Sequence, residues 1–236
     1  MNTFKDYLDL CRVSNLPTVW TNVLAASLLA GGGRFAPASY LLLALALSCF
    51  YLAGMSLNDL CDVELDRRQR PSRPLPSGRI SLWNASALTL ALFAAGLLLL
   101  AVAPHPSGVA ASLLLLLAIV VYDFRHKGNP FSVLIMATCR FLVFVVVSLA
   151  LTGQLNAWVI LAGGLQFFYV VLISLIARYE NSRASPFPFP VIPAMLAGIS
   201  LLDGLVMALL LAFPWLFAGM AGAVLTWAGQ RHVRGD

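Results

Sequence analysis

Long apolar segments alternate with short polar ones along the whole chain, and none of them shows the residue-by-residue alternation of a half-buried strand. Several apolar segments reach the about 20 residues that a helix needs to cross a bilayer core. The last two helices share one apolar run, which we divide at 212–214 because Pro214 starts a helix more easily than it continues one. The pattern predicts eight helices, near 16–32, 38–58, 82–103, 108–123, 132–152, 157–177, 189–211 and 214–230.

Composition supports a membrane protein. Of the 236 residues, 60% are hydrophobic and only 11% are charged, whereas a soluble domain carries about 25% charged residues. The fold class predicted is therefore all-α, a multi-span transmembrane helical bundle of about eight helices that forms one domain over 1–236. Residues 1–15 lack the cleavage pattern of a signal peptide, and we expect a short interfacial helix there.

The positive charges predict the orientation of the bundle. Thirteen of the fifteen Lys and Arg residues fall in the N-terminal segment, the C-terminal segment and every second connection between helices. This distribution predicts a multi-pass integral membrane protein with both termini cytoplasmic, and we expect a bacterial plasma membrane. The net charge of +5 lies in these segments, so it does not indicate a partner among the nucleic acids. The sequence does not predict an oligomeric state.

An acidic stretch interrupts the pattern directly after an uncharged segment. Residues 58–79 read "NDLCDVELDRRQRPSRPLPSGR". Asn58, Asp62 and Asp66 are spaced i, i+4, i+8, and Asp59 is seven residues before Asp66, so on a helix these four side chains lie on one side. Like charges on one face repel each other, and two kinds of positive partner are open: the arginines that follow, or a divalent cation.

A magnesium–diphosphate site would use this chemistry. Mg²⁺ is commonly held by one or two carboxylates together with waters and substrate phosphates, and neighbouring arginine or lysine side chains bind the remaining phosphate oxygens. A diphosphate at the end of an apolar bundle implies a substrate whose other end lies among apolar helices. An isoprenyl diphosphate has that form.

Four stretches carry a resemblance to a known family. "NDLCDVELD" matches the N-D-x-x-D-x-x-x-D signature of the UbiA superfamily of intramembrane prenyltransferases, and "RRQRPSRPLPSG" resembles the run that follows it there. "CRVSNLPTVWTN" resembles the first helix of that family, and "YDFRHKGNP" resembles the stretch after its fourth helix. The resemblance implies Mg²⁺-dependent transfer of an isoprenyl group from a prenyl diphosphate to a small aromatic or other lipid-precursor acceptor within the membrane.

The resemblance also implies the site residues. Mg²⁺ is the implied cofactor, and its implied ligands are Asn58, Asp59, Asp62 and Asp66. The residues expected to take part in catalysis are Asp62, Asp66, Lys127 and Tyr122, with Tyr122 on the acceptor side.

The expected substrate contacts come from several parts of the chain. Arg140 and Asp203 lie inside apolar helices, where a charge needs a partner; Asp203 could pair with Arg140 or line the cavity. The side chains expected to bind substrate are Arg12, Asn15, Asn58, Arg67, Arg73, Arg140, Arg178, Glu180 and Arg183.

The resemblance breaks at the second acidic motif of the family, D-x-E-G-D-R. Here the stretch reads "RYENSR", with Arg178 and Ser182 at the aspartate positions, while Glu180 and Arg183 agree. One hypothesis is that the Arg178 guanidinium takes the place of a second cation. The alternative is a protein that binds a prenyl chain or another lipid without catalysis. A transporter is a third class, but the charges cluster on one face and the chain shows no repeated halves.

Overall fold

The computed structural model describes residues 3–125, 129, 131–183, 187–233 and 235. Within these ranges the chain forms nine α-helices, joined by turns and one short 3₁₀ helix, η1 (Val13–Asn15). The α-helices are α1 (Thr3–Leu10), α2 (Leu16–Ala30), α3 (Pro37–Gln69), α4 (Leu82–Ala101), α5 (Ser107–Arg125), α6 (Ser132–Thr152), α7 (Ala157–Ser182), α8 (Val191–Leu210) and α9 (Trp215–Gly229).

The predicted helical bundle is confirmed. Each of the eight predicted helices corresponds to one of α2–α9, and the short N-terminal helix is α1. Six helices in the described part of the chain, α3 to α8, are long and apolar enough to cross a membrane. The other two, α2 and α9, have 15 residues each, which is fewer than a full bilayer crossing needs. The chain is thus a multi-pass membrane protein.

The predicted end of α3 at residue 58 was wrong, because the helix continues through the whole acidic stretch to Gln69. The extension is stable since its charged side chains have partners: Glu64 pairs with Arg67 at 2.5 Å on the exposed side, and the buried carboxylates meet arginines described below. The helix ends just before Pro71, because the residue that precedes a proline is disfavoured in the helical region. The predicted end of α7 at residue 177 was also too early, because the helix continues to Ser182.

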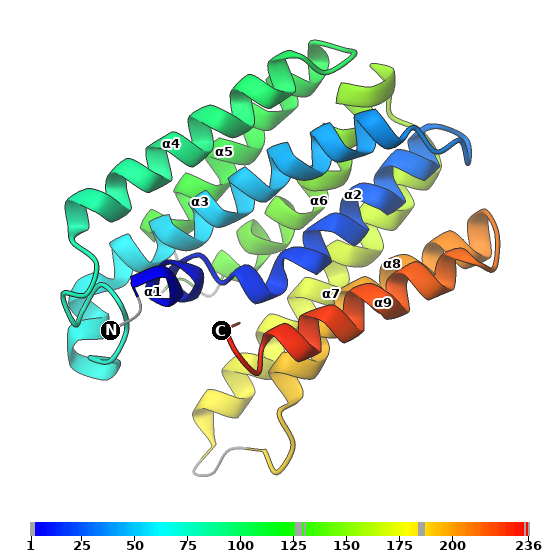
Figure 1. Cartoon of the computed structure of the whole chain (residues 1–236). Helices are drawn as coiled ribbons and strands as arrows, with labels where there is room; N and C mark the ends of the chain where they lie inside the picture. The colour runs from blue at the N-terminus through cyan, green and yellow to red at the C-terminus, as the bar shows by residue number, and fades with distance from the viewer. Residues whose placement is uncertain (1–2, 126–128, 130, 184–186, 234, 236) are drawn as a thin grey trace.

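The helices run side by side, with α2 in the middle (Figure 1). It packs against α3, α6, α7, α8 and α9. Both termini, the α3–α4 connection and the α7–α8 connection lie at one end of the bundle, and the α2–α3, α4–α5, α6–α7 and α8–α9 connections lie at the other (Figure 1). We call the first of these the termini end.

Close backbone packing joins α8 to α9. A Cβ atom added to Gly219 would lie 2.5 Å from the Cα atom of Gly204, which is too close for any side chain. Small residues at helix crossings are the usual device for tight packing between membrane helices. This contact holds α9 against α8, and both helices also pack against α2.

Candidate functional site

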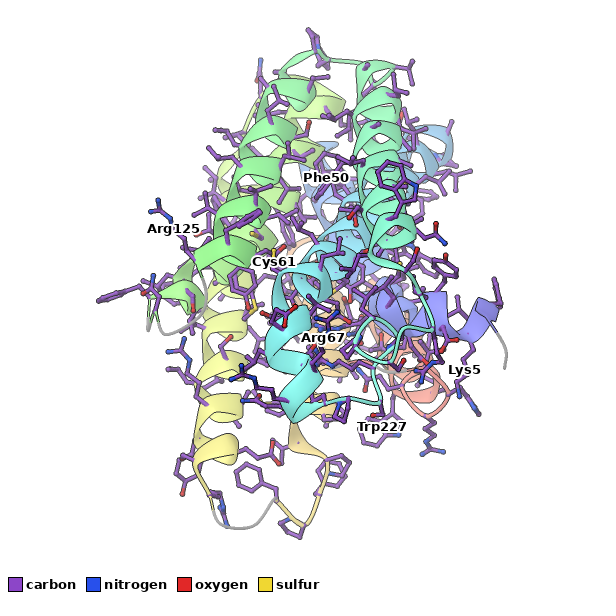
Figure 2. All side chains as sticks on the ribbon, turned by 90° about the vertical axis from the view of Figure 1, so that its left-hand side faces the viewer. Lys5, Phe50, Cys61, Arg67, Arg125 and Trp227 are labelled. Atoms are coloured by element: carbon purple, nitrogen blue, oxygen red, sulfur yellow. The ribbon has the colours of Figure 1, made fainter. Side chains whose placement is uncertain are left out.

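A cavity of about 250 Å³ opens among α2, α3, α5, α6, α7 and α8. Most of its wall is apolar, from side chains such as Phe50, Leu115 and Val143. Its polar lining consists of Arg12, Asn15, Thr18, Tyr51, Asn58, Tyr122, Asp123, Cys139 and Arg140. Figure 2 shows Phe50 high in the bundle, with Cys61 and Arg67 further along α3 toward the termini end. The cavity is therefore apolar over most of its wall and meets the acidic stretch of α3 on its polar side.

Asn58 joins the cavity to the acidic face of α3. Its Oδ1 accepts a hydrogen bond from Arg12 Nη2 at 3.3 Å, and the same nitrogen forms an ion pair with Asp59 Oδ1 at 3.0 Å. Arg12 precedes α2 and has a left-handed backbone, with φ at 47°. Asp62 lies one helical turn beyond Asn58 on the same face and is partly exposed.

Arg73 is the second positive partner of the acidic face. It is buried, at 6% exposure, and comes from the connection that follows α3. Its Nη1 forms ion pairs with Asp66 and, at 3.6 Å, with Asp59. The sequence left open whether arginines or a divalent cation neutralise the acidic face of α3. In the structure Arg12 and Arg73 neutralise Asp59 and Asp66.

Asp123, at the end of α5, is a member of this site that sequence reasoning missed. Its side chain is buried, and its Oδ1 accepts a hydrogen bond from Asn58 Nδ2 at 3.1 Å. It also interacts electrostatically with Asp62. A signal was present, because Asp123 follows Tyr122 at the end of an apolar segment, the same setting that singled out Asp59 and Asp62.

These residues fit a magnesium ion. No cluster of three or more His, Cys, Asp or Glu side chains within reach of one metal occurs in the part of the chain described. Mg²⁺ does not need one, because it takes one or two carboxylates and completes its shell with water and phosphate oxygens. Asn58 and Asp62, with Asp123 hydrogen-bonded to Asn58, offer the oxygen ligands that Mg²⁺ prefers.

Several predicted site residues do not line the cavity. Arg67 is exposed and pairs with Glu64. Arg178 is exposed and donates to Ser132 Oγ at 3.2 Å and to the backbone carbonyl of Asn129 at 3.4 Å. Arg178 therefore stays a proposed, not an observed, diphosphate contact. Lys127 lies outside the described residues.

The remainder of the second acidic motif packs against the α7–α8 connection. Glu180 accepts a hydrogen bond from the backbone nitrogen of Phe187 at 3.3 Å. The Arg183 guanidinium lies over the rings of Phe187 and Tyr179, at 4.7 Å and 5.8 Å from their centroids. Such cation–π contacts hold the end of α7 in place, and neither Glu180 nor Arg183 lines the cavity.

Arg140 reaches the cavity from α6 and is held by α2. Its Nη1 donates to Asn22 Oδ1 at 2.7 Å, and its Nη2 donates to Thr18 Oγ1 at 3.3 Å. Asn22 in turn donates to Asp203 Oδ2 at 2.7 Å. Asp203 thus does not pair directly with Arg140 in the described structure but is linked to it through one amide.

The C-terminal segment also contributes to the cavity wall. Asn15 Nδ2 donates to the backbone carbonyl of Gly235 at 2.6 Å, and Asn15 Oδ1 accepts from Gln230 Nε2 at 2.8 Å. Asn15, expected to bind substrate, lines the cavity with its amide engaged by this segment.

Cys11, next to Arg12, is a buried cysteine. Burial, together with the negative charge of Asp59, raises the pKa of the Cys11 thiol to about 11. The group therefore stays protonated at neutral pH and is a poor nucleophile or metal ligand.

Comparison with known proteins identifies relatives of this chain. Among curated relatives, the digeranylgeranylglyceryl phosphate synthase of Sulfurisphaera tokodaii is 30% identical over 166 residues, which cover 70% of this chain and 53% of the relative. That of Methanococcus aeolicus is 37% identical over 97 residues, which cover 40% of this chain and 34% of the relative. The chain thus matches about half, or less, of the length of these relatives.

Solved structures share the fold. A structure described for digeranylgeranylglyceryl phosphate synthase in membranes superposes with a TM-score of 0.64 at 20% identity, covering 99% of this chain and 96% of that one. A UbiA homologue from Archaeoglobus fulgidus, bound to DMAPP and Mg²⁺, has a TM-score of 0.63 at 16% identity, with coverage of 95% and 98%. The sequence pattern of the UbiA prenyltransferase family matches residues 18–234. The chain, with its acidic helix end beside an apolar intramembrane cavity, belongs to the UbiA prenyltransferase family.

Proposed function

We propose that this protein transfers an isoprenyl group from a prenyl diphosphate to a lipid acceptor within the membrane, with Mg²⁺ as its cofactor. One observation carries the proposal: Asn58, Arg12 and Asp123 lie together on the polar side of a cavity whose remaining wall is mostly apolar. A diphosphate needs the polar groups and an isoprenyl chain needs the apolar wall, and the cavity joins the two.

The residues divide the chemistry between them. When bound, Mg²⁺ offsets the charge of the diphosphate, and Asn58 and Asp62 are the ligands that this structure favours. Asp59 and Asp66 are held by Arg12 and Arg73, and they remain proposed ligands for a state in which substrate binding releases them.

The transfer itself is a displacement at the allylic carbon. The C1–O bond breaks with both electrons leaving on the diphosphate, where Arg12 stabilises the developing charge. The acceptor atom forms a bond to C1, and its proton passes to the departing diphosphate. We place Tyr122 at the acceptor side of the cavity, which it lines.

The relatives favour a lipid acceptor over an aromatic one. They are named for a product with two geranylgeranyl groups on glyceryl phosphate, so we propose a hydroxyl-bearing glyceryl phosphate lipid as the acceptor. An aromatic acceptor has no support from these names. The alternative of a binder without catalysis stays open because Arg178 and Ser182 replace the second pair of aspartates.

Product formation by the purified protein tests the proposal. In nanodiscs with Mg²⁺, geranylgeranyl diphosphate and geranylgeranylglyceryl phosphate, we expect acceptor-dependent release of diphosphate and a doubly prenylated lipid detected by mass spectrometry. Omission of Mg²⁺ serves as the control and should abolish both signals. Binding of the donor without any release of diphosphate would instead support the non-catalytic binder.

We further propose that the termini end of the bundle is cytoplasmic, because thirteen of the fifteen Lys and Arg residues belong to that end by sequence. In a cysteine-free variant, a cysteine placed at position 72 should react with an impermeant maleimide from the cytoplasmic side only. A cysteine placed at position 106 should react from the opposite side only. Reaction of both from one side would contradict this orientation. The named relatives are archaeal and do not support the bacterial membrane expected from sequence.

A further inference from the structure

We propose that Arg140 binds an anionic group of the acceptor lipid, and that Asn22 and Asp203 position its guanidinium for this purpose. The inference rests on the proposed transfer reaction and adds the substrate group that this part of the cavity recognises. Its starting point is location: Arg140 lines the cavity, is partly exposed to it, and lies eight residues inside α6.

The contacts of Arg140 differ from those of the other arginines near the site. Its hydrogen bonds go to two uncharged oxygens, Asn22 Oδ1 and Thr18 Oγ1. Across the described ranges it has no carboxylate within ion-pair distance, whereas four other arginines do: Arg12, Arg67, Arg73 and Arg79. A guanidinium has five N–H donors, so these two bonds leave donors that can face the cavity.

Asn22 acts as a spacer between two opposite charges. Its amide group donates to Asp203 Oδ2 while its oxygen accepts from Arg140, and both distances are 2.7 Å. The other oxygen of Asp203 accepts from Gln166 Nε2 at 2.7 Å, and Asp203 is only 2% exposed. The carboxylate is thus hydrogen-bonded on both oxygens and compensates the buried cation from one amide away.

This arrangement has a physical consequence. A cation inside a membrane bundle needs a negative charge nearby, but a direct ion pair would occupy the fork of the guanidinium. Because Asn22 stands between Arg140 and Asp203, the negative charge of Asp203 still compensates the guanidinium. The guanidinium also keeps its orientation, and its remaining donors are available to a ligand. The planar fork of arginine matches a phosphate or carboxylate group.

The acidic face of α3 has cationic partners other than Arg140. Arg12 forms an ion pair with Asp59, and Arg73 forms one with Asp66, whereas the Arg140 guanidinium is bonded to Thr18 and Asn22 of α2. The anion at Arg140 is therefore assigned to the second substrate, in agreement with the phosphate-bearing acceptor proposed above.

A pair of acceptor probes tests the inference: geranylgeranylglyceryl phosphate and its neutral counterpart, geranylgeranylglycerol. With geranylgeranyl diphosphate as donor, the unaltered protein should prefer the phosphorylated probe in kcat/KM by roughly 10- to 100-fold, the range expected for hydrogen bonds to a charged group. Arg140→Met should remove the preference by raising KM for that probe alone. The donor KM should not change. Arg140→Lys should restore part of the preference, and Asn22→Leu should lose it although Arg140 is present.

The control is Arg34→Met, which changes an exposed arginine in the α2–α3 connection and should behave like the unaltered protein. If Arg140→Met lowers the rates with both probes equally, the residue is structural and the inference fails while the transfer reaction stands. If the protein shows no turnover, equilibrium binding of the two probes, measured by microscale thermophoresis, tests the inference separately from the reaction. Without turnover, tighter binding of the phosphorylated probe that Arg140→Met abolishes would uphold the inference while the proposed function fails. Equal binding of both probes would overturn the inference.

Discussion

Replacement of Asp62 by asparagine should lower prenyl transfer by about 10²–10³-fold, the usual cost of removing one preorganised group that stabilises developing charge. Asp62 is partly exposed on the acidic face of α3, one turn from Asn58, so it is the carboxylate best placed for a metal bound next to the cavity. Asparagine keeps the size of the side chain and removes its charge. Initial rates of diphosphate release at saturating donor measure the effect.

The matched control is Glu64→Gln, two residues further along the same helix. Glu64 is exposed and, among the residues that the structure describes, pairs with the exposed Arg67 alone, so this change should leave the rate unaltered. Titration with Mn²⁺, followed by electron paramagnetic resonance, gives a readout besides activity and should show weaker binding in Asp62→Asn alone. A full rate in Asp62→Asn would remove Asp62 from the proposed mechanism.

Replacement of Arg73 by methionine should produce the largest loss of stability, about 3–5 kcal/mol, because it leaves the buried Asp66 carboxylate without its cation. Arg73 and Asp66 are both about 6% exposed as side chains, and Arg73 also pairs with Asp59. At roughly 2–4 °C per kcal/mol for a chain of this size, thermal unfolding in detergent should show the change clearly.

Two companion variants make this result specific. Arg70→Met changes an exposed arginine three residues earlier and should stay within about 0.5 kcal/mol of the original stability. The double variant Arg73→Met, Asp66→Leu should recover part of the loss, since it removes the Asp66 carboxylate that the single variant leaves buried without a cation. A double variant less stable than Arg73→Met would show that burial of an unpaired carboxylate is not the cause.

Helix positions and the one-sided acidic face could be predicted from the sequence because both depend on local periodicity. Asn58, Asp62 and Asp66 share a face through spacing alone. The end of α3 was missed because partners elsewhere in the chain stabilise its charged turns. Arg12, 47 residues from Asp59, is such a partner, and no local sequence pattern predicts this contact.

The remaining parts of the site depend on how the helices pack. Asp123 meets Asn58 across 65 residues, and Arg140 meets Asn22 across 118. The sequence indicated that Arg140 needs a partner but not that an amide would stand between it and Asp203. These contacts follow from the packing of α3 against α5 and of α2 against α6, which apolar periodicity does not specify.

The length of α3 has a consequence for the direction of the reaction. At 33 residues the helix is about 50 Å long, against about 30 Å for the hydrocarbon core of a bilayer. Its acidic end therefore reaches the interfacial layer while its apolar part stays in lipid. On the proposed function, the two products form at a boundary between two phases. The diphosphate dissolves in water and the prenylated lipid stays in the bilayer. After release, little diphosphate enters the bilayer and little prenylated lipid enters the water. The two products therefore rarely meet again, and their partition between the phases opposes the reverse reaction.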